Sequence, residues 1–144
     1  MKKSLLVLCA SIAALAGAAA AQSPQTFSTR LSPVPITVDM QATVAGSGTV
    51  TATLNGRRLT IDGKFEGLRS PATVARLHLA PPARRGDAFA DLKVTSGTSG
   101  TITGTVDLTP DQMQALTRRS VYVQLHSEKA PEGNLWGWLM ETKR

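Results

Sequence analysis

The chain has 144 residues, of which 42% are hydrophobic, 18% charged and 4% aromatic, with 12 glycines and 8 prolines. This length suits a single domain. The composition excludes a disordered chain, a coiled coil and a collagen-like repeat. The formal net charge is +6 and there is one cysteine, Cys9. Both values change if the first 21 residues are removed.

Those first 21 residues have the three parts of a secretory signal peptide. They are a basic head at Lys2-Lys3, a short apolar run over 5–16 and an A-x-A site at Ala19 and Ala21. The pattern predicts cleavage near Ala21 and export to the periplasm or the extracellular space. The apolar run is shorter than the roughly 20 residues that a membrane-spanning helix needs, and no second run follows. No transmembrane span is therefore expected.

The predicted mature chain, residues 22–144, contains no cysteine because Cys9 belongs to the signal. A lipoprotein anchor at Cys9 is not expected, since Leu8 occupies a position that needs a small residue. Removing Lys2 and Lys3 from the 16 basic residues leaves 14 against 10 acidic residues, a net charge of +4. The sequence thus excludes disulfides, a thiol nucleophile and a thiolate metal site.

After a short flexible lead at 22–26, apolar residues recur mostly with a period of two, and turn residues follow at regular intervals. Asn55-Gly56 is the kind of pair that forms a tight hairpin turn. The pattern predicts an all-β fold, an antiparallel β-sandwich over residues 27–141. Its strands are expected at 49–54, 59–65, 75–79, 90–94, 102–108, 121–125 and 135–139.

One short helix is predicted among the strands, from Pro110 to about Thr117. Thr109 offers a hydroxyl cap, Pro110 takes the first helical position, and Gln112 stands three residues after the cap. A helix of two turns is expected to close one end of the sandwich. The segment 80–87 is rich in proline, arginine and glycine and is predicted to be an exposed loop.

Three passages carry a family resemblance. The first is 54–68, a strand-turn-strand that ends in Gly-Leu, and the second is Ala75-Arg76-Leu77-His78. The third comprises 108–112 (Leu-Thr-Pro-Asp-Gln), 122–127 (Tyr-Val-Gln-Leu-His-Ser) and 131–137 (Pro-Glu-Gly-Asn-Leu-Trp-Gly). Together they resemble the CHRD domain family over roughly residues 27–140. The resemblance implies an immunoglobulin-like β-sandwich of secreted proteins, a family with no established general activity.

The chain departs from the family pattern at three positions. Arg76 stands where the family's A-H-I-H has its first histidine. Asn134 replaces a glutamate, and Trp136 replaces an arginine. If the family uses its H-x-H pair for metal, this chain has lost half of that pair.

Strand parity places several polar and aromatic residues away from the core, because successive side chains of a strand point to opposite faces. If Ala75 and Leu77 face the core, then His78 points away from it. If the three strands concerned are neighbours, the outward residues form one patch: Arg76, His78, Tyr122, Gln124, His126, Trp136 and Trp138. Each tryptophan could bury about 150–250 Å², which makes the patch a candidate contact surface. The alternatives are ordinary cross-strand packing or a loop that covers the patch.

The sequence favours a non-catalytic binding module whose partner is an unidentified envelope or extracellular protein or glycan. No enzyme activity and no cofactor are expected, because the chain lacks a nucleophile elbow, a zinc-protease motif, a P-loop and a dinucleotide fingerprint. Export argues against nucleic acid as a partner. Three arginine pairs leave an acidic glycan or an anionic lipid surface open: Arg57-Arg58, Arg84-Arg85 and Arg118-Arg119.

A metal-binding role for copper or zinc, using His78 and His126, is the alternative function. Sandwiches that resemble copper/zinc superoxide dismutase place H-x-H pairs on a strand. Two imidazoles are fewer than the three or four protein ligands usual for zinc. The sequence therefore predicts no metal site outright. His78 and His126 are the candidate ligands, and Asp87, Asp91 or Glu132 could complete the set only if the fold happened to bring one of them close.

Overall fold

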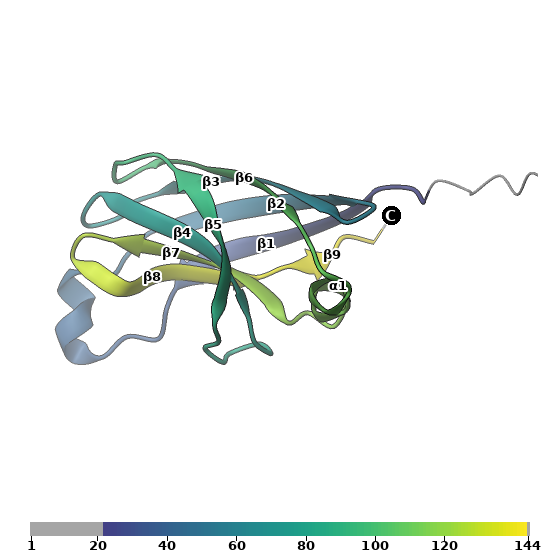
Figure 1. Cartoon of the computed structure of the whole chain (residues 1–144). Helices are drawn as coiled ribbons and strands as arrows, with labels where there is room; N and C mark the ends of the chain where they lie inside the picture. The colour runs from purple at the N-terminus through teal and green to yellow at the C-terminus, as the bar shows by residue number, and fades with distance from the viewer. Residues whose placement is uncertain (1–21, 144) are drawn as a thin grey trace, which may run out of the picture.

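The computed structural model describes residues 22–143, and the predicted signal peptide at 1–21 lies outside them. Residues 22–143 form nine strands, one α-helix and one 3₁₀ helix, and Figure 1 shows their arrangement. The strands are β1 (Gln25–Pro33), β2 (Ser47–Asn55), β3 (Arg58–Glu66), β4 (Ala72–Leu79), β5 (Ala88–Val94), β6 (Gly100–Asp107), β7 (Val121–Ser127), β8 (Ala130–Trp138) and β9 (Met140–Glu141). The helices are η1 (Val38–Ala42) and α1 (Pro110–Thr117). Within residues 22–143, no helix has the length and apolar character needed to cross a membrane.

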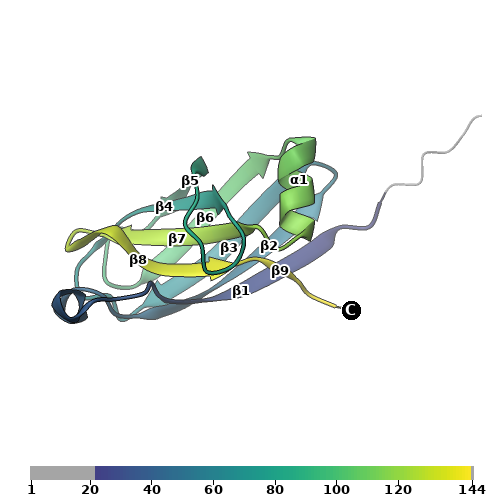
Figure 2. The same ribbon diagram turned by 90° about the horizontal axis from the view of Figure 1, so that it is seen from below.

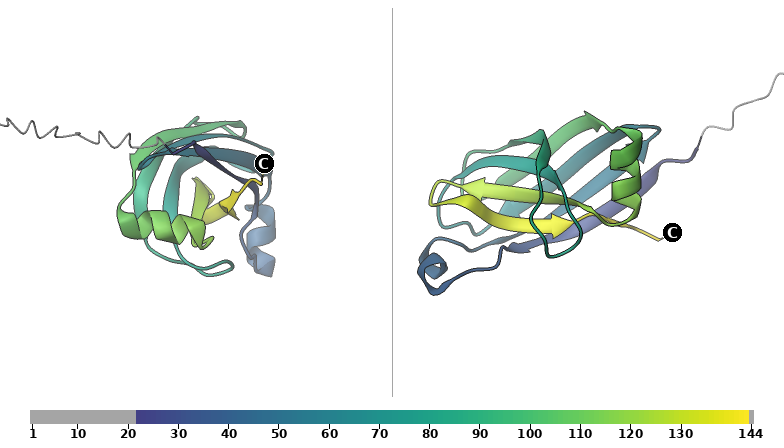
Figure 3. Two further views of the ribbon diagram at one scale, coloured as in Figure 1. Left: turned by 90° about the vertical axis from the view of Figure 1, so that its right-hand side faces the viewer. Right: turned by 60° about the horizontal axis from the view of Figure 1, so that its bottom comes forward.

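Strand β1 closes the sheet into a barrel. It runs antiparallel to β2 from Gln25↔Leu54 to Leu31↔Gly48, and its last residues, Ser32 and Pro33, pair with β8. Eight strands thus close in the order β1-β2-β3-β6-β5-β4-β7-β8, while β9 also pairs with β1. Figure 3 (left) shows these strands as a ring. The predicted immunoglobulin-like β-sandwich is therefore wrong, and the fold is a closed antiparallel barrel with one short helix.

The error has a physical reason. A period of two shows which residues face an interior, and a sandwich and a barrel share that pattern. What distinguishes them is the pairing of distant strands, and the strand that decides it, β1, was not among those predicted. Its buried residues Phe27 and Leu31 are four positions apart rather than two. β1 also begins at Gln25, inside the stretch 22–26 expected to be a flexible lead.

The seven predicted strands and their inward-facing residues agree with the structure. In β3, for example, buried residues alternate with exposed ones through the whole strand. The interior is filled by one cluster of side chains, whose largest fully buried members include Phe27, Leu59, Ile61, Leu77, Ile102, Leu125, Leu135 and Leu139. This apolar interior is the main source of stability for a domain that has no disulfide among its described residues.

Helix α1 has the predicted bounds and the predicted cap. The Thr109 hydroxyl accepts a hydrogen bond from the Gln112 amide at 3.2 Å, and the Gln112 side chain accepts one from the Thr109 amide at 2.9 Å. This reciprocal pair satisfies two amides that a helix start otherwise leaves without partners. Ala115 and Leu116 are buried against the barrel interior. The helix lies across one end of the barrel (Figure 3, left).

The outward-facing residues of the barrel differ in solvent exposure from strand to strand. On β2, the outward residues Thr49, Thr51 and Thr53 are exposed or half-buried, as expected for a sheet with one face in water. On β7, by contrast, all seven residues from Val121 to Ser127 are buried. Some other segment must therefore cover the outer face of β7.

Candidate functional site

The structure brings the seven predicted site residues together on the outer face of β4, β7 and β8. Antiparallel pairing sets them in cross-strand rows, and we call them the outer-face cluster. One row is Arg76, Gln124 and Trp136, the next is His78, Tyr122 and Trp138, and His126 lies opposite Val74. Strand parity thus predicted the right face for these residues, and the three strands are neighbours.

The aromatic members of the outer-face cluster pack against one another around Tyr122. The His78 ring stacks on the Tyr122 ring, with centroids 4.7 Å apart and planes 16° apart. Trp138 lies 4.7 Å from Tyr122 on centroids and also 4.7 Å from Trp136, the latter edge to face. Offset and edge-to-face contacts of this kind add about 0.5–1.5 kcal/mol each beyond the area that they bury.

The outer-face cluster is largely buried, which agrees with the alternatives of cross-strand packing and a covering loop rather than with an open contact surface. Tyr122 is 0% exposed, Gln124 2%, and His78 and His126 9% each. Trp136 and Trp138 are half-buried. The cover is the β4–β5 loop, residues 80–87, which crosses in front of β7 and β8 in Figures 2 and 3 (right).

Gly86 fastens this loop to the cluster. Its amide donates to the Tyr122 hydroxyl at 3.1 Å, and its carbonyl lies 2.8 Å from Nδ1 of His78. A Cβ at Gly86 would stand 1.8 Å from the Leu79 carbonyl oxygen, so only glycine fits this close approach. Trp138 secures the start of the loop, because its Nε1 donates to the Ala80 carbonyl at 2.9 Å.

Arg85 ties the same loop to β8. Its guanidinium donates to the Glu132 carbonyl at 2.9 Å and lies 5.9 Å from the ring centroid of Trp136. A cation at this distance over an indole contributes about 0.5–1 kcal/mol at an exposed site. Gln124 donates to the same Glu132 carbonyl at 3.1 Å. Side chains from the loop and from β7 therefore meet at one carbonyl of β8.

The two histidines make the same kind of hydrogen bond, from Nδ1 to a backbone carbonyl. Nδ1 of His78 lies 2.8 Å from the Gly86 carbonyl, and Nδ1 of His126 lies 2.8 Å from the Pro131 carbonyl. A carbonyl only accepts, so each Nδ1 carries the hydrogen and each neutral ring leaves a lone pair on Nε2. Both Nε2 atoms are buried without a hydrogen-bond partner. The ring centroids are 6.5 Å apart.

The surroundings of His126 favour its neutral form. Burial lowers the pKa of His126, and the charges of Arg76 and His78 act in the same direction. The hydrogen bond to Pro131 and the Glu132 carboxylate partly oppose that change. A neutral imidazole is the form that binds a metal ion.

Arg76 forms an ion pair with β5, the strand on the other side of β4 from β7. Its Nε lies 2.8 Å from Oδ1 of Asp91 on the neighbouring strand β5. Among residues 22–143, no group of three or more His, Cys, Asp and Glu side chains is placed to hold a metal ion. The two histidines are thus the donors that the outer-face cluster offers.

A shallow groove runs beside the exposed edge of the cluster, with a volume of about 320 Å³. We call it the tryptophan groove, and it is lined by Thr29, Arg30, Ser32, Pro82, Arg119, Trp136, Gly137, Trp138 and Met140. Met140 is exposed, and both arginines are exposed as well. The groove therefore combines half-buried indoles with two accessible cations.

Sequence reasoning missed Gly86 and Arg85 as parts of the site. The segment 80–87 was predicted to be an exposed loop, and most of it is exposed, but it also covers the cluster. A signal was present in the outward residues of β7, which are Tyr122, Gln124 and His126 rather than the threonines of β2. Large side chains with hydrogen-bonding groups at such positions indicate a covered face.

A protein-family model, the CHRD domain, matches residues 27–139, which is most of the chain. The chain belongs to the CHRD domain family. This confirms the resemblance drawn from the three sequence passages. A search of curated proteins found no match, and neither did a search of solved structures. In this CHRD domain, Arg76 lies inside the outer-face cluster, and Trp136 lines the tryptophan groove.

Proposed function

We propose that this CHRD domain protein is exported to the cell envelope or beyond, catalyses no reaction, and binds an acidic glycan in the tryptophan groove. The single observation that carries this proposal is the pairing of two half-buried indoles with two exposed guanidinium groups, Arg30 and Arg119, in one groove. Export rests on the signal-peptide pattern of residues 1–21.

The chemistry of the groove suits a charged sugar. Indole rings present a flat, largely apolar face, which matches the apolar face of a sugar ring. A guanidinium group binds carboxylate or sulfate through two parallel hydrogen bonds. Aromatic and arginine side chains are also the usual anchors of binding surfaces.

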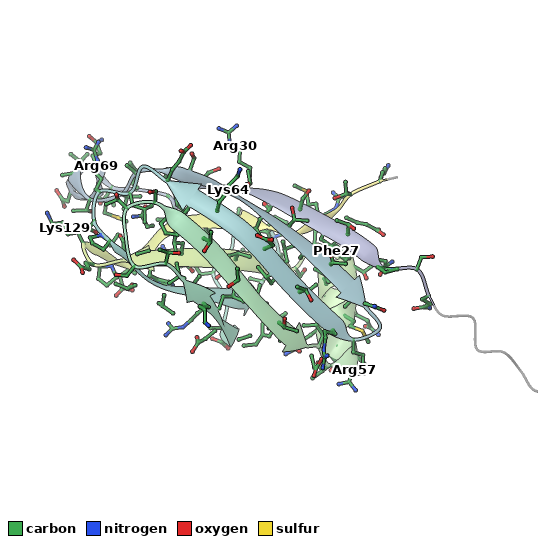
Figure 4. The ribbon with its side chains drawn as sticks, turned by 90° about the horizontal axis from the view of Figure 1, so that it is seen from above. Phe27, Arg30, Arg57, Lys64, Arg69 and Lys129 are labelled. Carbon is green, nitrogen blue, oxygen red and sulfur yellow. The ribbon has the colours of Figure 1, made fainter. Side chains whose placement is uncertain are left out.

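The two arginines of the groove are available for such a ligand. The ion pairs found in residues 22–143 join Arg58 to Asp107 and Arg76 to Asp91, so neither Arg30 nor Arg119 takes part in one. Figure 4 shows the Arg30 side chain standing clear of the barrel, close to Lys64. Arg30 and Lys64 also line a neighbouring hollow of about 380 Å³, together with one acidic residue, Glu66.

The test is titration of the protein with a heparin-derived oligosaccharide, with a neutral dextran oligosaccharide for comparison. The double variant Arg30→Gln/Arg119→Asn removes both cations, and asparagine suits the positive φ of 60° at position 119. Hydrogen bonds to charged groups contribute about 1.5–3 kcal/mol each, so affinity should fall at least about tenfold. The neutral oligosaccharide should bind far more weakly.

A matched control removes the same number of charges elsewhere. Arg69→Gln/Lys129→Gln acts at the opposite end of the barrel from α1, where Figure 4 shows both side chains. This variant should keep most of the affinity. Equal losses in the two double variants, or no binding by the unsubstituted protein, would contradict the groove as the binding site.

Metal binding by His78 and His126 is a second candidate function. It is favoured by the two buried Nε2 atoms that lack a hydrogen-bond partner. Metal-ligating histidines commonly donate their other ring nitrogen to a backbone carbonyl, as both of these do. Titration with Zn(II), Cu(II) and Cu(I), read by histidine NMR, tests this function. No change at either ring with any of these ions would contradict it.

A further inference from the structure

The two histidines of the outer-face cluster lie near one another, and the Nε2 atom of each is buried without a hydrogen-bond partner. His78 is paired with Tyr122 and His126 with Val74, so their backbone positions are four residues apart along the paired strands. At a rise of about 3.3 Å per residue, that is roughly 13 Å along the sheet. The ring centroids nevertheless lie only 6.5 Å apart, so both side chains lean inward.

This separation is close to that of two imidazoles sharing one ion. A metal bound by Nε2 at about 2.0 Å stands roughly 3 Å from the ring centroid. Two rings on opposite sides of one ion would therefore have centroids about 6 Å apart, whereas a tetrahedral angle would bring them to about 5 Å. The observed 6.5 Å is nearer to the separation expected for the linear arrangement than to that for the tetrahedral one.

The number and type of donors restrict the ion further. Zinc normally takes four ligands and Cu(II) takes a tetragonal set of nitrogen and oxygen donors. Within the described part of the chain, no His, Cys, Asp or Glu joins the two histidines in a group of three. A d¹⁰ ion that is stable with two nitrogen ligands in a line is Cu(I).

The local charge and the burial of the site also favour Cu(I). Arg76 lies on the same face between the two histidines and is itself a cation, although Asp91 partly offsets its charge. The positive charge of Arg76 disfavours binding of a dication more than binding of a monocation. The flanking Tyr122 is fully buried and both Nε2 atoms are inaccessible to water, which limits oxidation of a bound Cu(I).

From these observations we infer that His78 and His126 bind one Cu(I) ion between their Nε2 atoms, with no third protein ligand. The inference rests on the second candidate function, metal binding, and names the ion and its coordination. The loop residue Gly86 holds the His78 ring through its carbonyl and anchors Tyr122 through its amide. The same loop thus fixes the orientation of one ligand and would cover a bound ion.

The experiment is an anaerobic competition titration with the Cu(I) chelator bathocuproine disulfonate. All proteins carry Cys9→Ser, because the Cys9 thiol would bind Cu(I) by itself. The reference protein, which carries Cys9→Ser and no other substitution, should withdraw one Cu(I) per chain from the chelator. Its X-ray absorption edge should be that of two-coordinate Cu(I).

Two variants remove the ligand atoms without removing the hydrogen bonds that hold the loop and strand. In His78→Asn and His126→Asn, the side-chain amide can still donate to the Gly86 or Pro131 carbonyl, but no nitrogen stands at the Nε2 position. Each variant should lose more than about 100-fold in Cu(I) affinity, beyond the 10–100-fold loss typical of partners that do not touch the metal. Unchanged thermal unfolding of the variants would show that the fold is retained.

The outcomes separate this inference from the second candidate function. Failure of the reference protein to take up Cu(I), or equal Cu(I) affinity in the reference protein and both variants, would overturn the inference. Binding of Zn(II) or Cu(II) at the two histidines, with no Cu(I) uptake, would uphold metal binding and overturn the choice of Cu(I). If only water occupies the space, no ion will change the histidine signals, and both the inference and the second candidate function fail.

Discussion

His78 and His126 lie four positions apart along the paired strands β4 and β7, yet their ring centroids are only 6.5 Å apart. Each ring is fixed by a hydrogen bond of 2.8 Å from Nδ1 to a backbone carbonyl. These two bonds decide the ring orientation and leave both Nε2 atoms unpartnered in a buried site. This arrangement links the fold to the proposed metal chemistry.

The first prediction concerns Arg76 in the outer-face cluster. Arg76→His places a third imidazole on the same face, between the two histidines, and removes the nearby cation. Cu(I) affinity should then rise at least about tenfold above that of Arg76→Gln, which removes the charge without adding a ligand. Chelator competition measures both. Equal affinities would show that position 76 does not reach the ion.

The second prediction concerns the loop that covers the outer-face cluster. Gly86→Ala forces a Cβ against the Leu79 carbonyl and should displace the loop, lowering the free energy of unfolding by about 1–3 kcal/mol. In the same loop, Ala83 has a positive φ of 65°, which glycine adopts without strain. Ala83→Gly should therefore leave stability unchanged or slightly raised. Urea unfolding compares the two, and equal losses would contradict the tight packing of Gly86.

The third prediction is a dependence of stability on pH in the metal-free protein. Burial lowers the pKa of His126 below its value of about 6.5 in an unfolded chain. The native state thus binds fewer protons than the unfolded state in this range. Stability should be fully present above about pH 6.5 and should fall as pH drops from there to the native pKa.

Urea unfolding between about pH 7.5 and 5.5 measures this effect. His126→Asn has no imidazole at this position and should show a weaker dependence over the same range. An unchanged slope in that variant would place the effect on other groups.

The fourth prediction concerns the cap of α1. Thr109→Ala removes the acceptor for the Gln112 amide and should reduce stability by about 0.5–2 kcal/mol. Thr117→Ala is the matched control, because its hydroxyl only donates to the Met113 carbonyl within the last helical turn. That control should change stability by less. The reverse order would contradict the importance of the capping box.

The features predicted correctly from the sequence are those set by local chemistry. The bounds of α1 follow from Thr109 and Pro110, and the faces of β4, β7 and β8 follow from alternation alone. The gathering of His78, His126 and the two tryptophans on one face is a consequence of that alternation once the strands are neighbours. These inferences needed no knowledge of distant contacts.

The features that could not be predicted depend on long-range contacts. Barrel closure depends on pairs such as Ser32↔Trp136, more than 100 residues apart in the chain. Burial of the cluster depends on the hydrogen bond between Gly86 and Tyr122, whose positions differ by 36. Neither contact leaves a periodic trace in the sequence, so the sequence left a contact surface, cross-strand packing and a covering loop open as alternatives for the cluster.

The most direct test of the buried histidine pair is long-range ¹H–¹⁵N NMR of the imidazole rings. The chain has two histidines, so the spectrum contains only the signals of His78 and His126. At neutral pH both rings should carry the proton on Nδ1, and one equivalent of Cu(I) should shift the Nε2 resonances of both. A proton on Nε2 of either ring, or no response to Cu(I), would contradict the account.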